Sequence, residues 1–288
     1  MAIKNSIIVD PLWDTANKGE QSRLLYNIIS NNFFDVVEIW DTLDNDVLSM
    51  IEKYSSKVEF DVSLSPLMNE HKYNLTSNRK NINIAINYLR HRITSLSNIG
   101  VKNISLSSPI FDLSISRQKQ VENFCASLKQ VCDIADKHGI QVCFEAFDVF
   151  ADKKRLLGTS LEIYKLFQNI DSNNLHLTWD LGHICLNREN YIESLELLKT
   201  YIKRVHISNF SFDKNDNIYG DKHLPFDKVG NIKCVDIKRI VDYIQKTNLD
   251  ISMAFEVASN VHIKNVETSF KSYKYVCSLV KQYVNGGR

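Results

Sequence analysis

The chain has 288 residues, with 35 lysines and arginines against 34 aspartates and glutamates, and a formal net charge of +1. This length fits one α/β barrel domain, and a content of 44% hydrophobic and 24% charged residues excludes the disordered, collagenous and fibrous classes. The balanced charge gives no sign of the polybasic surface that nucleic-acid-binding proteins carry, although it does not exclude a local patch.

Eight short runs rich in β-branched and aromatic residues predict strands. Several are almost continuously hydrophobic, as are parallel strands that are buried on both faces. In chain order the runs are 6–10, 35–40, 57–64, 101–107, 140–147, 175–180, 203–208 and 251–257.

Eight helix-like segments alternate with these runs. In the segment 117–138, Val121, Phe124 and Leu128 repeat at a spacing of three and four, and Gly139 follows at the position where helices commonly end. The other segments are 18–31, 44–54, 79–98, 159–169, 189–200, 235–246 and 262–283.

This alternation predicts a parallel sheet, and eight is the number of strands that closes a (β/α)8 TIM barrel. An open doubly wound sheet is the alternative. No Pro/Gly-rich linker or break in composition divides the chain, so we predict a single barrel domain over residues 1–288. The longest irregular stretch, 209–233, is expected to be functional, because long loops in compact domains usually are.

Cysteine usage and apolar runs bear on the cellular compartment. None of the six cysteines forms a C-x-x-C pair and most lie in apolar stretches, so we expect reduced residues rather than a disulfide framework. The apolar run 7–9 is too short for a signal-peptide core, and no window has the roughly 18 apolar residues that cross a membrane. We therefore expect a cytoplasmic protein without a membrane partner.

Four polar side chains interrupt the apolar runs at the ends of four successive strands. They are Glu145 in VCFEAF, Asp180 in LTWDLG, His206 in RVHISN and Glu256 in MAFEVA. A carboxylate buried in such a run must be paired, protonated or metal-bound. Any one of them alone is more often a cap, a surface residue or a core residue. Four at the same end of a barrel predict a shell of mainly oxygen ligands around one divalent cation.

A second group of polar residues follows in the chain. His183 lies three residues after Asp180, beyond a glycine, and Asp221 and His223 lie in the long loop after the seventh strand. These side chains could bind a second ion, orient a substrate, or be solvated loop residues, and the residues alone leave the three alternatives open.

Several motifs, in their order and spacing, resemble the xylose isomerase-like TIM-barrel family, which contains AP endonuclease family 2 proteins of the endonuclease IV type and sugar isomerases and epimerases. The resemblance covers essentially the whole chain, and the D-x-G-H box followed by a strand-end histidine is its most specific part. The motifs are VVEIW (36–40), HKYNL (71–75), FEAF (144–147), WDLGH (179–183), VHISN (205–209), DKHLPFDKVGNI (221–232) and AFEV (254–257).

The resemblance implies that one divalent metal, of the manganese, cobalt, magnesium or zinc type, is held by the four strand-end residues, Glu145, Asp180, His206 and Glu256. His183 matches a position that contacts substrate in the epimerases or binds a second zinc in the nuclease branch.

Three further positions match the nuclease branch. Asp221 and His223 match its D-x-H, and His71 matches its strand-three histidine. That branch also has a histidine at the end of the fourth strand, where this chain has Ser107 and Ser108, so the resemblance does not imply a complete three-zinc site.

We expect first an isomerase or epimerase that removes a proton α to a metal-bound carbonyl of a keto-sugar or polyol-type substrate. Glu145 and Glu256 are the expected catalytic proton carriers. Trp13, Trp40 and Phe147 are expected either to form an apolar wall behind the sugar or to pack the barrel mouth. A dehydratase begins with the same step and is not separable from sequence.

Two alternatives remain. An endonuclease IV-like metal-dependent phosphodiesterase acting on abasic DNA is favoured by Asp221, His223 and His71, and disfavoured by the serines of the fourth strand and the lack of a basic and aromatic strip. A non-enzymatic barrel is the least favoured, because the set of four ligands is intact. The family resemblance allows a homo-oligomer, but no apolar interface stripe stands out.

Overall fold

The computed structural model describes residues 3–12, 18–42, 44–214, 218–226, 230–258 and 266–286. Eight parallel strands pair in the closed order β1-β10-β7-β6-β5-β4-β3-β2. The predicted barrel is therefore confirmed, and the alternative prediction of an open doubly wound sheet is wrong. The barrel strands are β1 (Lys4–Ile8), β2 (Val36–Trp40), β3 (Glu59–Ser63), β4 (Asn103–Ser107), β5 (Gln141–Glu145), β6 (Leu175–Asp180), β7 (Ile202–Ser208) and β10 (Ser252–Glu256).

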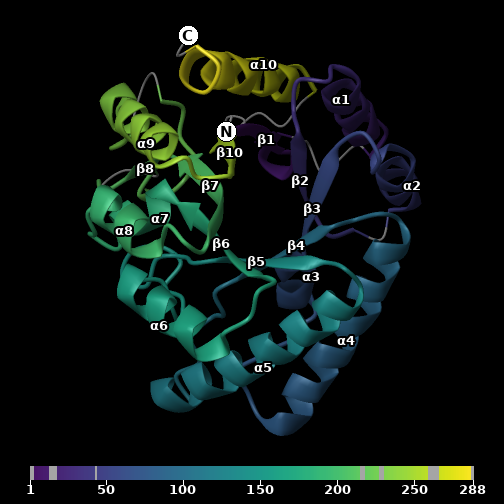
Figure 1. Ribbon diagram of the computed structural model, residues 1–288, viewed down its shortest axis with the longest axis vertical. Helices are drawn as coiled ribbons and strands as arrows, with labels where there is room; N and C mark the ends of the chain where they lie inside the picture. Colours follow the sequence, from purple (N-terminus) through teal and green to yellow (C-terminus); the bar gives the residue numbers. More distant parts are fainter. Residues whose placement is uncertain are drawn as a thin grey trace.

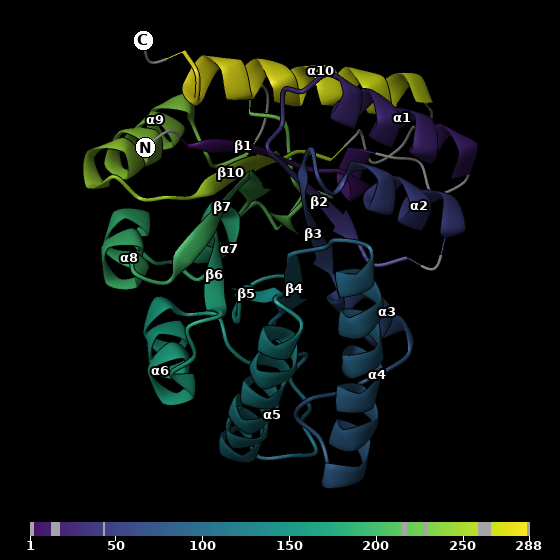
Figure 2. The ribbon, with the colours of Figure 1, turned by 45° about the vertical axis from the view of Figure 1, so that its right-hand side comes forward.

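The longer helices surround this barrel (Figure 1). Helix α4 begins and ends at the predicted residues, and most of the others differ from the prediction by one or two residues at their ends; residues 262–265 lie outside the described part of the chain. The long helices α4 and α5 lie side by side (Figure 2). The longer helices are α1 (Lys18–Ser30), α2 (Asn45–Tyr54), α4 (Arg79–Asn98), α5 (Arg117–Lys137), α6 (Ser160–Ile170), α8 (Tyr191–Leu198), α9 (Cys234–Thr247) and α10 (Val266–Tyr283).

Three short helical segments were not predicted. They follow their strands almost at once: η1 (Asp10–Leu12) after β1, α3 (Ser65–Glu70) after β3, and α7 (Leu181–Leu186) after β6. Segments of three to six residues are too short to display a helical period, so the sequence pattern does not reveal them. Because they lie at the carboxyl ends of the strands, they shape the mouth of the barrel.

The apolar core fills the layer between the strands and the helices. Phe144 of β5 and Phe124 of α5 are both buried, and their ring centroids lie 5.7 Å apart. Side chains alternate between the two faces of a strand, so the residues next to these apolar ones point to the barrel axis. The hydrophobic strand runs thus account for the outer face of the sheet.

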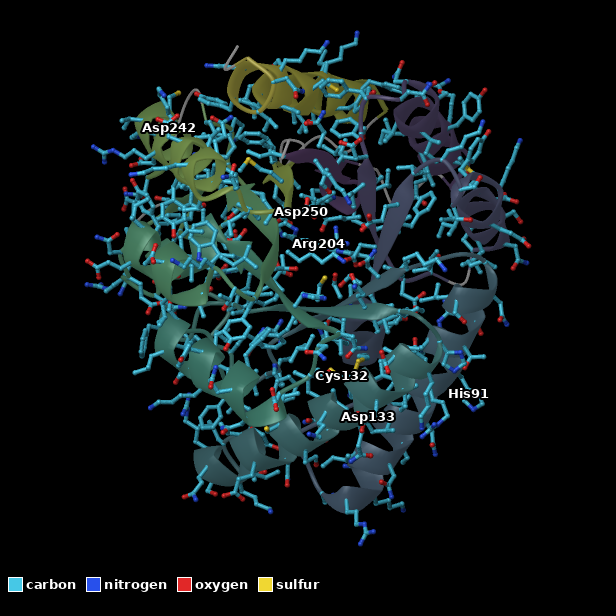
Figure 3. All side chains as sticks on the ribbon, in the orientation of Figure 1. His91, Cys132, Asp133, Arg204, Asp242 and Asp250 are labelled. Atoms are coloured by element: carbon cyan, nitrogen blue, oxygen red, sulfur yellow. The ribbon has the colours of Figure 1, made fainter. Side chains whose placement is uncertain are left out.

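The interior of the barrel is polar, whereas barrels usually pack branched apolar residues there. Arg204 of β7 is only 1% exposed and lies near the centre of the molecule (Figure 3). Its Nε lies 2.7 Å from Asp61 Oδ2, and one of its terminal nitrogens lies 3.4 Å from Glu59 Oε1. A buried guanidinium requires such partners, because an unpaired charge in a core is very costly.

The predicted loop 209–233 contains a short antiparallel pair, β8 (Phe210–Ser211) with β9 (Gly220–Asp221). Asn209 Oδ1 accepts hydrogen bonds from the backbone N–H groups of Phe210 and Ile232, both at 3.0 Å, and so joins the two ends of the loop. This pairing carries Asp221 to the mouth of the barrel.

No helix in the described ranges combines the length and the apolar character that crossing a bilayer requires. The six cysteines are free; Cys132 and Cys143 are buried, and Cys234 is exposed.

Candidate metal centre

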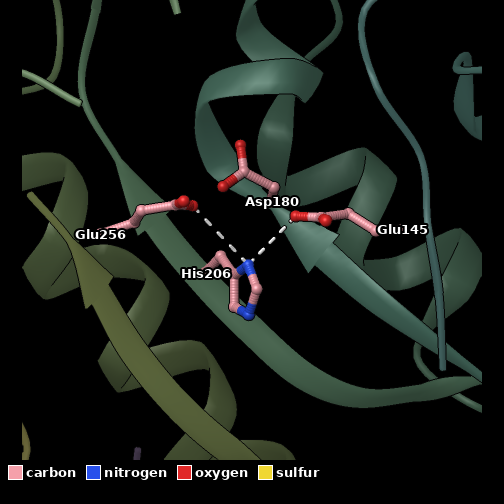
Figure 4. Close-up of side chains that lie close together, drawn as sticks. All are labelled: Glu145, Asp180, His206 and Glu256. Atoms are coloured by element: carbon pink, nitrogen blue, oxygen red, sulfur yellow. Dashed lines mark hydrogen bonds and ion pairs between the residues drawn. The ribbon is translucent and has the colours of Figure 1, made fainter. Parts of the chain in front are cut away.

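The four predicted strand-end residues meet at the mouth of the barrel. Glu145, Asp180 and Glu256 are the last residues of β5, β6 and β10, and His206 lies near the end of β7. One possible ligand atom from each lies within 4.8 Å of all the others, and Figure 4 shows the four side chains pointing toward one another. Parallel strands bring their carboxyl ends to one edge, which is why residues 111 positions apart in the sequence converge here.

His206 lies between two sets of carboxylates. Its Nδ1 is 3.1 Å from Glu145 Oε1 and 3.8 Å from Glu256 Oε2 (Figure 4). Its Nε2 forms a 2.8 Å hydrogen bond with Glu38 Oε2 on the side away from the cluster. The nitrogen that faces Glu145 and Glu256 is therefore Nδ1.

Asp180 has one oxygen engaged and one free. Its Oδ1 accepts hydrogen bonds from the backbone N–H of His183 at 2.8 Å and from Ser208 Oγ at 2.9 Å. Its Oδ2 is buried and has no hydrogen-bond partner among the described residues. An unsatisfied buried carboxylate oxygen is costly, and a cation would offset that cost. The donor set of three carboxylates and one imidazole suits a divalent ion of the zinc, manganese or cobalt type.

The pKa shifts in the cluster result from the crowding of buried carboxylates. Burial, together with the charges of Glu145 and Asp180, raises the pKa of Glu256 to about 7 despite the opposing histidines. Burial opposes the charging of His206, but the charges of Glu38 and Glu145 outweigh it and raise its pKa well above the ordinary value. The cluster thus favours the uptake of positive charge, which a divalent cation can supply.

The second predicted group lies beside the first. His223 Nε2 is 3.1 Å from Asp221 Oδ2 and 3.4 Å from Glu256 Oε1, while His183 Nε2 is 3.7 Å from Asp221 Oδ2. Burial opposes the charging of both histidines, but neighbouring carboxylates raise the pKa of His183 to about 9 and that of His223 to about 10. The members of this group are therefore not solvated loop residues. Binding a second ion and orienting a substrate are the two alternatives that remain.

Two further residues hold the second group. The ammonium of Lys153 lies 3.3 Å from Asp221 Oδ2 and already offsets part of its charge. Asp148 Oδ2 lies 3.4 Å from Nδ1 of His183, and its oxygens accept hydrogen bonds from the backbone of residues 151–153. An ion bound by Asp221 would have to share this carboxylate with Lys153.

The family described as xylose isomerase-like TIM barrel matches residues 31–274 by its sequence profile. The chain belongs to this family. The resemblance recognised from the strand-end motifs is thus confirmed.

Relatives among curated proteins are partial matches. An uncharacterised protein of Methanocaldococcus jannaschii is 25% identical over 167 residues, covering 57% of this chain and 49% of that protein. A second uncharacterised protein of the same organism is 28% identical over 128 residues, covering 44% of this chain and 48% of that protein. The chain thus spans about half the length of the curated relatives it matches.

Solved structures match over nearly the whole chain. L-ribulose 3-epimerase has a TM-score of 0.75 at 17% identity and covers 99% of this chain and 95% of its own. The IOLI protein with a bound zinc atom has a TM-score of 0.75 at 16% identity, and the match covers 98% of this chain and 99% of that protein. The probable 3-DHS dehydratase AsbF of Bacillus anthracis has a TM-score of 0.66 at 15% identity, and the match covers 94% of this chain and 99% of that protein. At these identities the likeness shows the shared fold.

His71 is not one of the residues that the described structure brings together in the strand-end cluster. This residue ends α3 on the exposed surface, where its ring lies 5.4 Å from that of Tyr73 and 6.0 Å from that of Tyr88. Ser108, which directly follows β4, is engaged elsewhere, since its hydroxyl accepts a hydrogen bond from the backbone N–H of Leu157. The described residues thus provide no third group of ligands at β3 and β4.

Sequence reasoning missed Glu38, Asp148 and Lys153. Glu38 interrupts the apolar run VVEIW in the same way as the four strand-end residues interrupt theirs, so the same signal could have found it. Asp148 and Lys153 lie in a loop, where no apolar run makes a polar residue stand out.

Two of the three aromatic residues expected to form an apolar wall, Trp40 and Phe147, lie in the described part of the chain. Trp40 and Ile8 line a small cavity of about 50 Å³ that three of the cluster residues also line, and the Trp40 side chain is 51% exposed. The ring of Phe147 packs against that of His183 in a tilted arrangement, with 4.5 Å between the ring centroids. Trp13 lies outside the described residues.

Proposed function

We propose that this protein is a divalent-metal-dependent isomerase or epimerase that acts on a keto-sugar or polyol-type compound, with a dehydratase as the variant that shares its first step. The observation that carries the proposal is the convergence of Glu145, Asp180, His206 and Glu256, with ligand atoms within 4.8 Å of one another. An ion held by these four residues would act as a Lewis acid toward the carbonyl and hydroxyl oxygens of a substrate.

Glu145 and Glu256 are the proposed proton carriers. They approach the same nitrogen of His206 from β5 and β10, at 3.1 Å and 3.8 Å, and so flank the place where a substrate would bind. One carboxylate would remove the proton α to the carbonyl, and the other would return a proton on the opposite side. Trp40 would give the sugar an apolar surface at the mouth and exclude water from the exchanging proton.

The second candidate function is a metal-dependent phosphodiesterase of the endonuclease IV type. It is favoured by the gathering of His183, Asp221 and His223 next to Glu256, where a second zinc could be bound. It is disfavoured by the exposed position of His71 and by the ammonium of Lys153 on Asp221. For the first candidate, His183 and His223 would instead orient substrate hydroxyls.

Metal analysis and proton exchange test the proposal. We expect about one divalent ion per purified chain, its loss in Glu145→Gln, and its retention in Glu52→Gln, which changes an exposed carboxylate of α2. Incubation with a panel of ketoses in D2O should place deuterium at the carbon next to the carbonyl. Two or more zinc ions per chain, with cleavage of an abasic duplex and no deuterium uptake, would favour the second candidate. An unchanged metal content in Glu145→Gln would contradict the site assignment.

A further inference from the structure

The two ring nitrogens of His206 face different surroundings. Nδ1 faces Glu145 and Glu256 in the cluster, at 3.1 Å and 3.8 Å. Nε2 forms a 2.8 Å hydrogen bond with Glu38, a residue of β2 that is not one of the four cluster residues. A neutral imidazole has one protonated nitrogen and one with a lone pair, so the partner of one nitrogen determines what the other can do.

Glu38 is itself held in place by the polar interior of the barrel. It is 7% exposed, and the hydroxyl of Ser6 on β1 donates a hydrogen bond to its Oε1. The guanidinium of Arg204 lies 3.9 Å from the same oxygen. Oε1 is thus directed to Ser6 and Arg204, and Oε2 is directed to His206.

We propose that Glu38 is a positioning residue of the metal centre. It accepts the Nε2–H of His206 and thereby leaves the Nδ1 lone pair directed at the site where the cation binds. This inference rests on the proposed function, because it assumes that the cluster binds a divalent ion. Carboxylate partners of this kind fix the tautomer and the ring orientation of a metal-binding histidine and increase its basicity.

A general electrostatic effect is the competing explanation, since any carboxylate in the barrel would attract a cation. Glu59 is the matched control. It lies on the adjacent strand, β3, and is 3.4 Å from the same guanidinium, but makes no hydrogen bond or ion pair with His206 in the described structure. Removing its charge changes the field of the barrel and leaves the Glu38–His206 hydrogen bond intact.

Zinc affinity of the metal-free protein, measured by calorimetry on the full chain, tests the proposal without an activity assay. We expect Glu38→Gln to weaken zinc binding by about 10- to 100-fold. Glu59→Gln should weaken it by less than about threefold, since only a screened charge is lost. Equal affinities for Glu38→Gln and the wild type, or equal losses in both variants, would overturn the proposal.

Nitrogen-15 NMR of the His206 ring in the zinc-loaded wild type gives a second measurement that needs no variant. We expect a protonated Nε2 and a metal-bound Nδ1, and the opposite assignment would overturn the proposal even if Glu38→Gln failed to fold. If the wild type binds no zinc, manganese or cobalt, the proposed function itself fails. A wild type that binds the ion, with an unaffected Glu38→Gln, refutes only the role of Glu38.

Discussion

Asp180 caps a helix with one oxygen and is a proposed metal ligand through the other. Its Oδ1 is the N-cap of α7, because it accepts the backbone N–H of His183, while its buried Oδ2 lacks a hydrogen-bond partner in the described structure. An N-cap stabilises a helix by satisfying one of its first N–H groups. The two functions are on different oxygens and can therefore be separated by substitution.

The substitution Asp180→Asn should separate them. The amide oxygen of asparagine can still accept the N–H of His183, so we expect a loss of stability below about 1 kcal/mol. If Asp180 is a ligand as proposed, the variant lacks its negative charge, so metal affinity should fall by at least about 100-fold. Chemical denaturation and metal titration measure the two quantities. Asp180→Ala is the control and should lose the cap as well; near-wild-type metal affinity in Asp180→Asn would exclude this residue as a ligand.

At the scale of the element, α7 is held against β7 by a close approach at Gly182. A Cβ added there would lie 2.2 Å from Ser208 Oγ and 3.2 Å from Asp180 Oδ1. Glycine allows this approach while Ser208 Oγ and Asp180 Oδ1 keep their positions beside the cluster. The glycine of WDLGH therefore has a packing function as well as a place in the motif.

Gly182→Ala should destabilise the protein by about 1–3 kcal/mol, because Ser208 Oγ must leave its place and its hydrogen bond to Asp180, or the backbone must shift, to accept the methyl group. Ser208→Ala removes the nearest atom and a hydrogen bond, at a cost of about 1 kcal/mol. The double variant, Gly182→Ala with Ser208→Ala, should lose less stability than the sum of the two single losses, because the added methyl group no longer overlaps with Ser208 Oγ. Urea denaturation of the four proteins measures this coupling, and strict additivity would argue against the contact.

At the scale of the whole molecule, the cluster concentrates carboxylates at one place in a chain whose formal net charge is only +1. Glu145, Asp180 and Glu256 meet beside Asp221, with positive charge supplied by histidines and Lys153. Folding must bring these charges together, and a bound cation reduces their repulsion. Metal binding and folding are therefore expected to be linked.

Removal of the metal by a chelator should lower the melting temperature. At a free metal concentration about 100 times the dissociation constant, binding stabilises the folded state by about 2.7 kcal/mol, which corresponds to several degrees for a chain of this size. Differential scanning calorimetry with and without the ion measures the shift. Asp180→Asn serves as the control and should show almost none. A wild type whose melting temperature does not respond to the chelator or to added ion would contradict the linkage.

Acid should destabilise the protein through His176 of β6. Burial, with help from Lys203 and Arg204, lowers the pKa of this histidine to about 4, and its Nε2 has no hydrogen-bond partner among the described residues. Because the pKa is lower in the folded state than in the unfolded state, protonation favours unfolding. The stability contributed by neutral His176 is complete above about pH 6.5 and is lost as the pH falls toward 4.

His176→Gln should remove up to about 2 kcal/mol of the stability loss between pH 6.5 and 4, after allowance for its partial exposure. His91→Gln is the control, since His91 is exposed on α4 (Figure 3). Denaturation at a series of pH values measures the slope. Parallel curves for His176→Gln and the wild type would show that His176 is not the responsible group.

Much of the fold and the first site could be predicted because the signals are local. The strand runs, the periodic helices and the polar residues that interrupt strand ends are all read within a few residues, and the ends of parallel strands must meet. The contacts that finish the site are not local. The hydrogen bond between His206 and Glu38 joins residues 168 positions apart, and no short-range pattern encodes it.

The sequence alone therefore determined the barrel and the grouping of Glu145, Asp180, His206 and Glu256, because alternation and strand ends follow from chain topology. Only the tertiary structure decided that Glu38 faces His206, that the ammonium of Lys153 contacts Asp221, and that His71 is exposed and not one of the clustered residues. The physical reason is that these outcomes depend on side-chain directions and on the charge that each buried group requires, which are set by neighbours distant in the chain.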